Sequence, residues 1–205
     1  MTRIVLHCSI SLDGFATGPA GDLTRLHDWM FSLDEGSGTS VASALTREFH
    51  ASKAIIFGRR TWDSGQEPWG EDDVFSAPVF VLTHELLQPV ERNGTVFTFV
   101  SNLHEAVRRA SAVTGGGDVA LMGSPAVAQQ AVAAGLVDEF LLHLVPVLLG
   151  SGTPCFGTFD GAPVELEPAG ADESPAVTGL RYRVRGAAQA NDTFVPAQTQ
   201  INCIC

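Results

Sequence analysis

The sequence predicts an α/β protein with a mostly parallel central sheet, an antiparallel edge and helices on the faces of the sheet. Two observations lead to this prediction. Along residues 3–148, short apolar runs alternate with segments of helical periodicity, which is typical of parallel strands joined by right-handed crossovers. Strand-like runs at 164–167 and 177–185 then follow with no helix between them, so we expect them to form an antiparallel pair.

The first quarter of the chain predicts a strand, a loop and a helix. Residues 3–11 are an apolar run closed by Ser-Leu-Asp-Gly, which predicts a buried strand and a turn. Residues 16–38 are rich in Gly, Asp and Ser and predict a long loop, with or without a helical turn, which in a compact domain is usually functional. Residues 39–51 predict a helix, because apolar side chains recur on one face. These side chains are Val41, Leu45 and Phe49.

The middle of the chain predicts three strands and a helix. The strands are expected at residues 53–57, 78–82 and 95–100, where short apolar runs are bounded by turn residues. Ser101 or Asn102 is expected to cap the helix that follows, through about Val113, and Glu105 is placed to form a capping box with Asn102.

The last third continues the alternation. Residues 118–122 predict a strand, and Ser124 is expected to cap the next helix. Pro125 at the first helical position and Gly135 just past the end are the usual boundary residues of a helix. Residues 139–148 then predict a long apolar strand.

The length of 205 residues suits one domain with a tail. We expect the domain to span residues 1–186. Residues 187–205 lack periodicity and are expected to be a flexible tail. The tail ends in Cys-Ile-Cys, which is interpreted either as part of a solvated terminus or as a thiol pair for disulfides, metal or modification.

Composition excludes several classes of partner. The formal net charge of -11 argues against nonspecific binding to nucleic acid or anionic membranes. No apolar stretch approaches the roughly 20 residues that span a bilayer, and the first residues lack the layout of a signal peptide. The sequence therefore predicts a soluble, cytoplasmic protein.

Metal and nucleophilic motifs are missing from the sequence. The six histidines have no metal-ligand spacing, and there is no G-x-S-x-G elbow or Walker loop. The glycines at 115–117 precede a strand instead of following it, so a Rossmann dehydrogenase fits poorly. The cysteines show neither a zinc pattern nor a disulfide framework, and reduced thiols are expected. They are Cys8, Cys155, Cys203 and Cys205.

A first candidate anion site lies where the strand at 53–57 ends. Gly58 is followed by Arg59, Arg60 and Thr61 at an expected helix start. Free backbone N–H groups and the helix dipole favour an anion at such a place, and arginine adds bidentate phosphate donors. The alternative is a solvated surface pair of arginines.

A second candidate anion site follows the strand at 118–122. Met122 ends the strand, and Gly123 and Ser124 lead directly into a helix, so no large side chain blocks approach to the backbone. The alternative is a tight turn between a strand and a helix with no ligand.

Asp13 is a candidate for the substrate side of a site. It lies in the turn at 11–14, before a loop that could fold over a ligand, and a carboxylate there could orient a polar substrate or relay a proton. The alternative is an Asx turn.

Taken together in this order, these segments resemble the dihydrofolate reductase superfamily. The GRRTW sequence at 58–62 is similar to the cofactor motif of that superfamily. Three further segments resemble the branch that contains the reductase domain of riboflavin biosynthesis and stand-alone bacterial reductases. They are SLDG at 11–14, GLVDE at 135–139 and PVLLGSG at 146–152. The likeness covers residues 1–186.

The resemblance implies that NADPH binds across the carboxyl edge of the sheet. It implies that Arg59, Arg60 and Thr61, which follow Gly58, hold the pyrophosphate and the adenosine phosphate. It implies further roles for residues at the ends of other strands. Leu82 and Thr83 would flank the adenine ribose. Gly123 and Ser124, which follow Met122, would meet the pyrophosphate together with the N–H groups of Ala126 and Val127. Ser9 and Ala16 would border the nicotinamide.

One departure from the superfamily concerns the substrate. Dihydrofolate reductases carry an acidic residue on the helix before the G-R-x-T motif, where this chain has small residues such as Ala42 and Ser43. Glu48 lies nearer the end of that helix, and Asp22 lies in the preceding loop. This argues against dihydrofolate as the substrate.

The leading hypothesis is therefore an NADPH-dependent reductase that transfers hydride to a small conjugated C=N, C=C or C=O group. The alternatives are a pyrimidine reductase of the riboflavin pathway, for which only Arg25 supplies a cation in the loop at 16–38, and a nucleotide-binding module without turnover. A third alternative, a peptide-modifying reductase, is suggested only by the last three residues. The long strand at 139–148 could pair with a second copy, which would give a homodimer.

Overall fold

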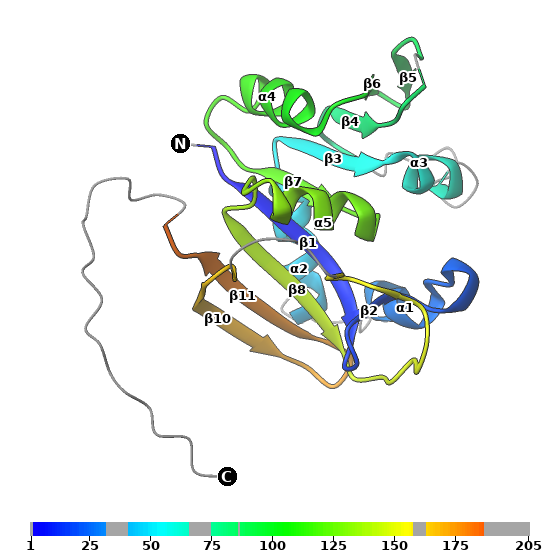
Figure 1. Cartoon of the computed structure of the whole chain (residues 1–205), viewed down its shortest axis with the longest axis vertical. Helices are drawn as coiled ribbons and strands as arrows, with labels where there is room; N and C mark the ends of the chain where they lie inside the picture. The colour runs from blue at the N-terminus through cyan, green and yellow to red at the C-terminus, as the bar shows by residue number, and fades with distance from the viewer. Residues whose placement is uncertain (1, 32–40, 66–74, 86, 158–162, 187–205) are drawn as a thin grey trace.

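The computed structural model describes residues 2–31, 41–65, 75–85, 87–157 and 163–186. Its main sheet is covered by helices on both faces (Figure 1). The strands are β1 (Ile4–Ser11), β2 (Phe15–Thr17), β3 (Ala54–Gly58), β4 (Val79–Leu82), β5 (Val90–Arg92), β6 (Thr95–Val100), β7 (Val119–Met122), β8 (Glu139–Val145), β9 (Thr153–Pro154), β10 (Leu166–Glu173) and β11 (Thr178–Val184). The helices are α1 (Thr24–Phe31), α2 (Val41–Ala51), α3 (Arg59–Gly65), α4 (Leu103–Val113) and α5 (Pro125–Ala133), with a 3-10 turn at Pro19–Gly21.

The main sheet has the order β10-β11-β8-β1-β7-β3-β4-β6-β5. Its six central strands, from β8 to β6, run parallel, whereas β11, β10 and the edge strand β5 pair antiparallel to their neighbours. The mostly parallel sheet with an antiparallel edge, predicted from the sequence, is confirmed. The carboxyl ends of the parallel strands therefore meet along one edge of the sheet, where α/β proteins bind ligands.

Alternation along β1 explains why helices cover both faces. Leu6 and Cys8 belong to a buried cluster with side chains from α4 and α5, whereas Val5 packs with Leu26 of α1 and Leu45 of α2. In Figure 1, α5 lies in front of the sheet and α2 behind it. A strand buried on both faces is what a parallel α/β sheet requires.

Several elements differ from the expectation, among them the short strands β2 and β9, which were not predicted. Residues 24–31 of the predicted loop form α1, which begins after Asp22 accepts hydrogen bonds from the Thr24 N–H (3.0 Å) and hydroxyl (2.8 Å). The unpredicted β5 pairs with β6 across a turn of Asn93 and Gly94, which both have positive φ; Asn-Gly between strands is the usual signal of such a hairpin. The strand at 139–148 ends at Val145, and the strand predicted at 164–167 is β10, over Leu166–Glu173.

The two predicted helix caps have different outcomes. The Asn102 side chain accepts a hydrogen bond from the Glu105 N–H at 3.1 Å, which confirms the start of α4. The Glu105 carboxylate, however, bonds Arg108 (2.7 Å) and Arg109 (2.6 Å) instead of completing a capping box. Ser124 is the N-cap residue of α5, as predicted, but its side chain makes no capping hydrogen bond. Pro125 at the first helical position has no N–H and therefore needs no acceptor.

No helix among the described residues is long and apolar enough to cross a membrane. The predicted domain ends with β11 and Gly186, and the tail at 187–205, with Cys203 and Cys205, lies outside the described residues.

Candidate active site

The two predicted anion sites come together at the carboxyl edge of the sheet. They are neighbours because β7 pairs with β3, although β7 lies some sixty residues later in the chain. A Cβ atom at Gly58 would lie 3.0 Å from the Val127 side chain and 3.1 Å from that of Ser124. A Cβ atom at Gly123 would lie 2.4 Å from the Thr61 hydroxyl oxygen. The starts of α3 and α5 therefore meet closely, with little room for a side chain at Gly58 and none without rearrangement at Gly123.

The two arginines at the start of α3 differ in their partners. The Arg59 guanidinium lies 2.7 Å from the Asp63 carboxylate through Nε and 2.6 Å from the Glu85 carboxylate through Nη1. These two carboxylates hold the pKa of Arg59 above its ordinary value. Arg60 is exposed, and its side chain makes no ion pair within the described part of the chain. Arg60 is thus the cation that can receive an anion without losing a partner.

The end of β4 lies beside the end of β3. Leu82 is in register with Gly58, so Thr83 and Arg59 follow directly on neighbouring strands. The Thr83 side chain is buried, and its hydroxyl accepts a hydrogen bond from the Glu85 N–H at 3.1 Å. This bond fixes the turn that carries Glu85 toward Arg59.

The start of α5 offers fewer free donors than predicted. The Val127 N–H donates to the Ser124 carbonyl at 3.0 Å, and the Val127 side chain is buried beside Gly58. The Val127 N–H is therefore already bonded within the protein. Of the two N–H groups predicted to contact the pyrophosphate, that of Ala126 remains a candidate. Met122 ends β7, and its side chain packs against a core cluster. At the carboxyl edge of the sheet a ligand would therefore meet the Met122 backbone.

Ser9 faces a group of aromatic and imidazole side chains that the motifs did not predict. Its hydroxyl accepts a hydrogen bond from the Trp29 indole at 3.3 Å and lies 3.4 Å from Nδ1 of His143. The His7 ring packs on His143 at 6.0 Å and on Phe49 at 5.5 Å between ring centroids. The signal in the sequence is the alternation of His7, Ser9 and Ser11 along β1, which places three polar side chains on one face.

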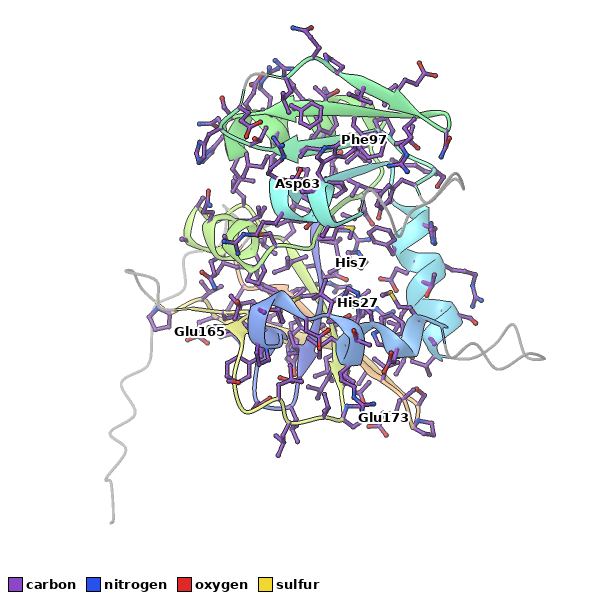
Figure 2. All side chains as sticks on the ribbon, turned by 90° about the vertical axis from the view of Figure 1, so that its right-hand side faces the viewer. His7, His27, Asp63, Phe97, Glu165 and Glu173 are labelled. Atoms are coloured by element: carbon purple, nitrogen blue, oxygen red, sulfur yellow. The ribbon has the colours of Figure 1, made fainter. Side chains whose placement is uncertain are left out.

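The two imidazoles of this cluster are buried and incompletely bonded. Within the described residues, Nδ1 of His7 and Nε2 of His143 have no hydrogen-bond partner, although both side chains are more than nine-tenths buried. Burial lowers the pKa of His7 to about 4 and that of His143 to about 3. Both rings are therefore neutral at pH 7. In Figure 2, which faces the carboxyl edge, His7 and His27 lie below Asp63 of α3.

Ala16 and Ser9 do not share a cluster. Ala16 on β2 is buried among the side chains that pack between the sheet and α5, together with Cys8 and Cys155. The two sulfur atoms lie 2.9 Å apart as free thiols, and contact with Cys155 together with burial raises the pKa of Cys8 well above its ordinary value. The predicted nicotinamide site thus has its two residues on different sides of β1.

Asp13 holds two loops together. Its carboxylate accepts hydrogen bonds from the Ser11 hydroxyl (2.5 Å) and the N–H groups of Leu149 (3.1 Å) and Gly150 (2.7 Å). The Ser11 bond, followed by the backbone donors, lowers the pKa of Asp13. A proton-relaying role would require these bonds to break, so the geometry favours a positioning role for Asp13.

Replacing Asp13 by alanine should loosen the loop at 147–150. The amides of Leu149 and Gly150 lose their acceptor, and we expect their hydrogen exchange to accelerate roughly tenfold. Asp13→Asn, which keeps one acceptor oxygen, should give an intermediate rate. Unchanged exchange at both amides would contradict the positioning role.

The acidic residues considered for proton donation are also engaged. The Glu48 carboxylate is bonded to Arg181 of β11, and Asp22 caps α1. Neither is available to a substrate in this arrangement.

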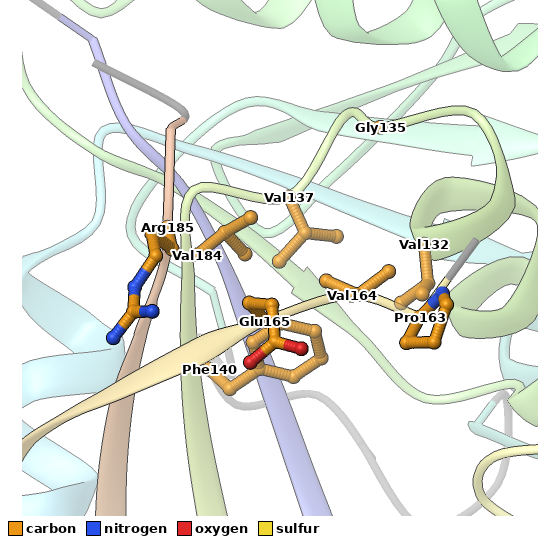
Figure 3. A pocket seen from close by; sticks show the side chains of 9 residues that line it. All are labelled: Val132, Gly135, Val137, Phe140, Pro163, Val164, Glu165, Val184 and Arg185. Carbon is orange, nitrogen blue, oxygen red and sulfur yellow. The ribbon is translucent and has the colours of Figure 1, made fainter. Parts of the chain in front are cut away.

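A hollow of about 330 Å³ lies elsewhere in the molecule (Figure 3). It is lined mainly by apolar side chains, with Glu165 and Arg185 beside them. Its walls include Val132 and Gly135, at the C-terminal end of α5, whereas Ser124 stands at the start of that helix. The hollow is therefore separate from the edge at which the two glycine turns meet.

Comparison with known proteins points to one family. A family model described as the RibD C-terminal domain matches residues 2–174. The uncharacterized protein YyaP of Bacillus subtilis (strain 168) is 30% identical over 162 residues, which make up 75% of this chain and 80% of YyaP.

Solved structures share the fold. A protein of Shewanella sp. PV-4, assigned provisionally to riboflavin biosynthesis, has a TM-score of 0.69 at 21% identity, over 90% of this chain and 99% of that one. The diaminohydroxyphosphoribosylaminopyrimidine deaminase/5-amino-6-(5-phosphoribosylamino)uracil reductase of Thermotoga maritima has a TM-score of 0.61 at 12% identity, over 89% of this chain and 56% of that one. A pyrimidine reductase-like protein of Corynebacterium diphtheriae has a TM-score of 0.55 at 15% identity, over 89% of this chain and 92% of that one.

Proposed function

This chain belongs to the RibD C-terminal domain family, and from that premise we propose that it is an NADPH-dependent oxidoreductase. It would transfer hydride to a small substrate with a conjugated C=N, C=C or C=O group. The observation that carries the proposal is the meeting of two glycine turns at the carboxyl edge, where a Cβ atom at Gly123 would lie 2.4 Å from the Thr61 hydroxyl oxygen. The Gly123 backbone is itself exposed at this edge, and exposed backbone beside cationic side chains suits a phosphate.

The residues at this edge fit a dinucleotide. Arg60 is exposed and makes no ion pair with any residue that the structure describes, the Thr61 hydroxyl lies against Gly123, and Ala126 lies in the first turn of α5. The helix dipole adds partial positive charge at that turn. Bound NADPH would supply the hydride, and the protein would bind its phosphates, orient its ring and exclude water.

The substrate side of the proposed site is the cluster around Ser9. Because His7 and His143 are buried and neutral at pH 7, they add no positive charge to this side of the site, which suits a neutral heteroaromatic ring better than an anion. We propose that this cluster positions the ring to be reduced, and that Asp13 maintains the adjoining loops.

Calorimetric titration of the purified chain with NADPH tests the cofactor assignment. Arg60→Ala should weaken NADPH binding by roughly 10- to 100-fold, because a charge-assisted hydrogen bond to phosphate is lost. Arg59→Ala should weaken it less, because Arg59 already binds two carboxylates. Arg108→Ala, which removes an exposed cation from α4, is the matched control and should leave binding unchanged. Absence of binding to both NADPH and NADH would contradict the proposed function.

Reduction of a phosphoribosylated pyrimidine is a second candidate. Family membership favours it, since the Thermotoga maritima relative is described as a uracil reductase. A ribose phosphate would need a cation to bind it. Arg25 on α1 is the candidate, and its guanidinium lies 3.9 Å from the Asp28 carboxylate, with which a phosphate would compete. NADPH oxidation measured against pyrimidines, pterins and quinones would separate the two candidates, and no turnover with NADPH bound would favour a binding module.

A further inference from the structure

We propose that Glu85 sets the preference of this chain between NADPH and NADH by competing with the adenosine 2′-phosphate for Arg59. The inference rests on the proposed function and adds to it a residue that determines cofactor specificity. It starts from the ion pair between the Arg59 guanidinium and the Glu85 carboxylate, which are 2.6 Å apart across two strand ends.

The backbone places Glu85 opposite Arg59. Gly58 of β3 and Leu82 of β4 are in register, so the residues after them leave the sheet side by side. The buried Thr83 hydroxyl accepts the Glu85 N–H at 3.1 Å, and the Thr83 N–H donates to the Val100 carbonyl at 2.9 Å. These bonds tie the turn to β6 and hold the Glu85 backbone within reach of Arg59.

The Arg59 guanidinium is already engaged by carboxylates on two sides. Asp63 bonds Nε from one turn along α3, and Glu85 bonds Nη1. The next residue, Arg60, makes no ion pair with its side chain among the residues that the structure describes. A phosphate that reaches Arg60 therefore meets an unpaired cation, whereas a phosphate that reaches Arg59 must displace a carboxylate or lie beside one.

The two cofactors differ in how they meet such a carboxylate. The 2′-phosphate of NADPH is an anion and is repelled by Glu85, whereas the 2′-hydroxyl of NADH is a donor that a carboxylate accepts. An acidic residue at the ribose favours NAD, and an arginine there accommodates the 2′-phosphate. Glu85 and Arg59 place an acidic residue and an arginine at the same position. The charge of residue 85 therefore determines how strongly Arg59 can bind the 2′-phosphate of NADPH.

Solvent limits the size of the effect. The Glu85 side chain is 63% exposed and that of Arg59 is 32% exposed, so water and salt screen their interaction. We expect Glu85→Gln to raise NADPH affinity roughly 2- to 5-fold and to leave NADH affinity unchanged or lower it roughly twofold. The ratio of the two affinities should therefore shift toward NADPH, and the shift should shrink at high salt.

The test is calorimetric titration of the full chain with NADPH and with NADH, for the unsubstituted protein, Glu85→Gln and Glu91→Gln. Glu91 lies exposed on β5, and its substitution removes the same charge without touching Arg59. A ratio that shifts in Glu85→Gln alone supports the inference. If NADPH binds and the ratio is equal in all three proteins, the inference fails while the proposed function stands. If neither nucleotide binds any of the proteins, both fail.

Discussion

Replacing Gly123 by alanine should destabilise the protein by about 2–5 kcal/mol and abolish detectable NADPH binding. Gly123 has φ +81, and an L-residue in this left-handed region costs roughly 1–2 kcal/mol. The new Cβ atom would also lie 2.4 Å from the Thr61 hydroxyl oxygen, and relieving such an overlap costs about 1–3 kcal/mol more. Denaturant unfolding and calorimetric titration with NADPH would measure the two effects.

Gly135→Ala is the matched control for this prediction. Gly135 follows α5 with φ +64, and a Cβ atom there would meet nothing within 4 Å. It therefore carries the backbone strain without the overlap. Adding Thr61→Ala to Gly123→Ala removes the hydroxyl and methyl groups that the new atom would meet and should restore part of the stability. If Gly123→Ala is no more destabilising than Gly135→Ala, the close approach of the two turns is not present in solution.

Lowering the pH from 7.5 to 5 should reduce the free energy of unfolding by about 4 kcal/mol through His7 and His143 together. Their folded-state pKa values are about 4 and about 3, below the ordinary 6.5. Between these limits the unfolded chain binds more protons than the folded chain, so acid favours unfolding. This contribution is complete above about pH 6.5 and is lost as the pH falls toward 4.

Urea unfolding at several pH values would measure this loss. His143→Gln should reduce the pH-dependent loss by about half, since one of two buried imidazoles is removed. His84→Gln is the control, because His84 is exposed and its substitution should leave the pH dependence intact. An equal pH dependence in the unsubstituted protein and in His143→Gln would contradict the assignment to the buried pair.

Local patterns were sufficient for most of the fold. Parallel strands read as apolar runs because both faces of the sheet are covered, as in the fully buried β3. The helix at α4 could be predicted because its capping residue, Asn102, acts within one turn. The segment of α1 was predicted as a loop with at most a helical turn, because its Gly- and Asp-rich surroundings are typical of a loop. The strand β5 was not predicted, although Asn93 and Gly94 carry a hairpin signal.

The candidate site, like the fold, could be predicted from the sequence only where its signals are local. Turn, cap and strand signals act over a few neighbouring residues, so they were enough to predict that two strands end in glycine turns that begin helices. The tertiary structure brings these two turns together, because β7 inserts between β1 and β3. It also decided that Glu85 reaches Arg59, that Asp13 binds the loop at 147–150, and that two imidazoles are buried beside Ser9. Pairings between residues distant along the chain depend on strand order and register, which local periodicity does not encode.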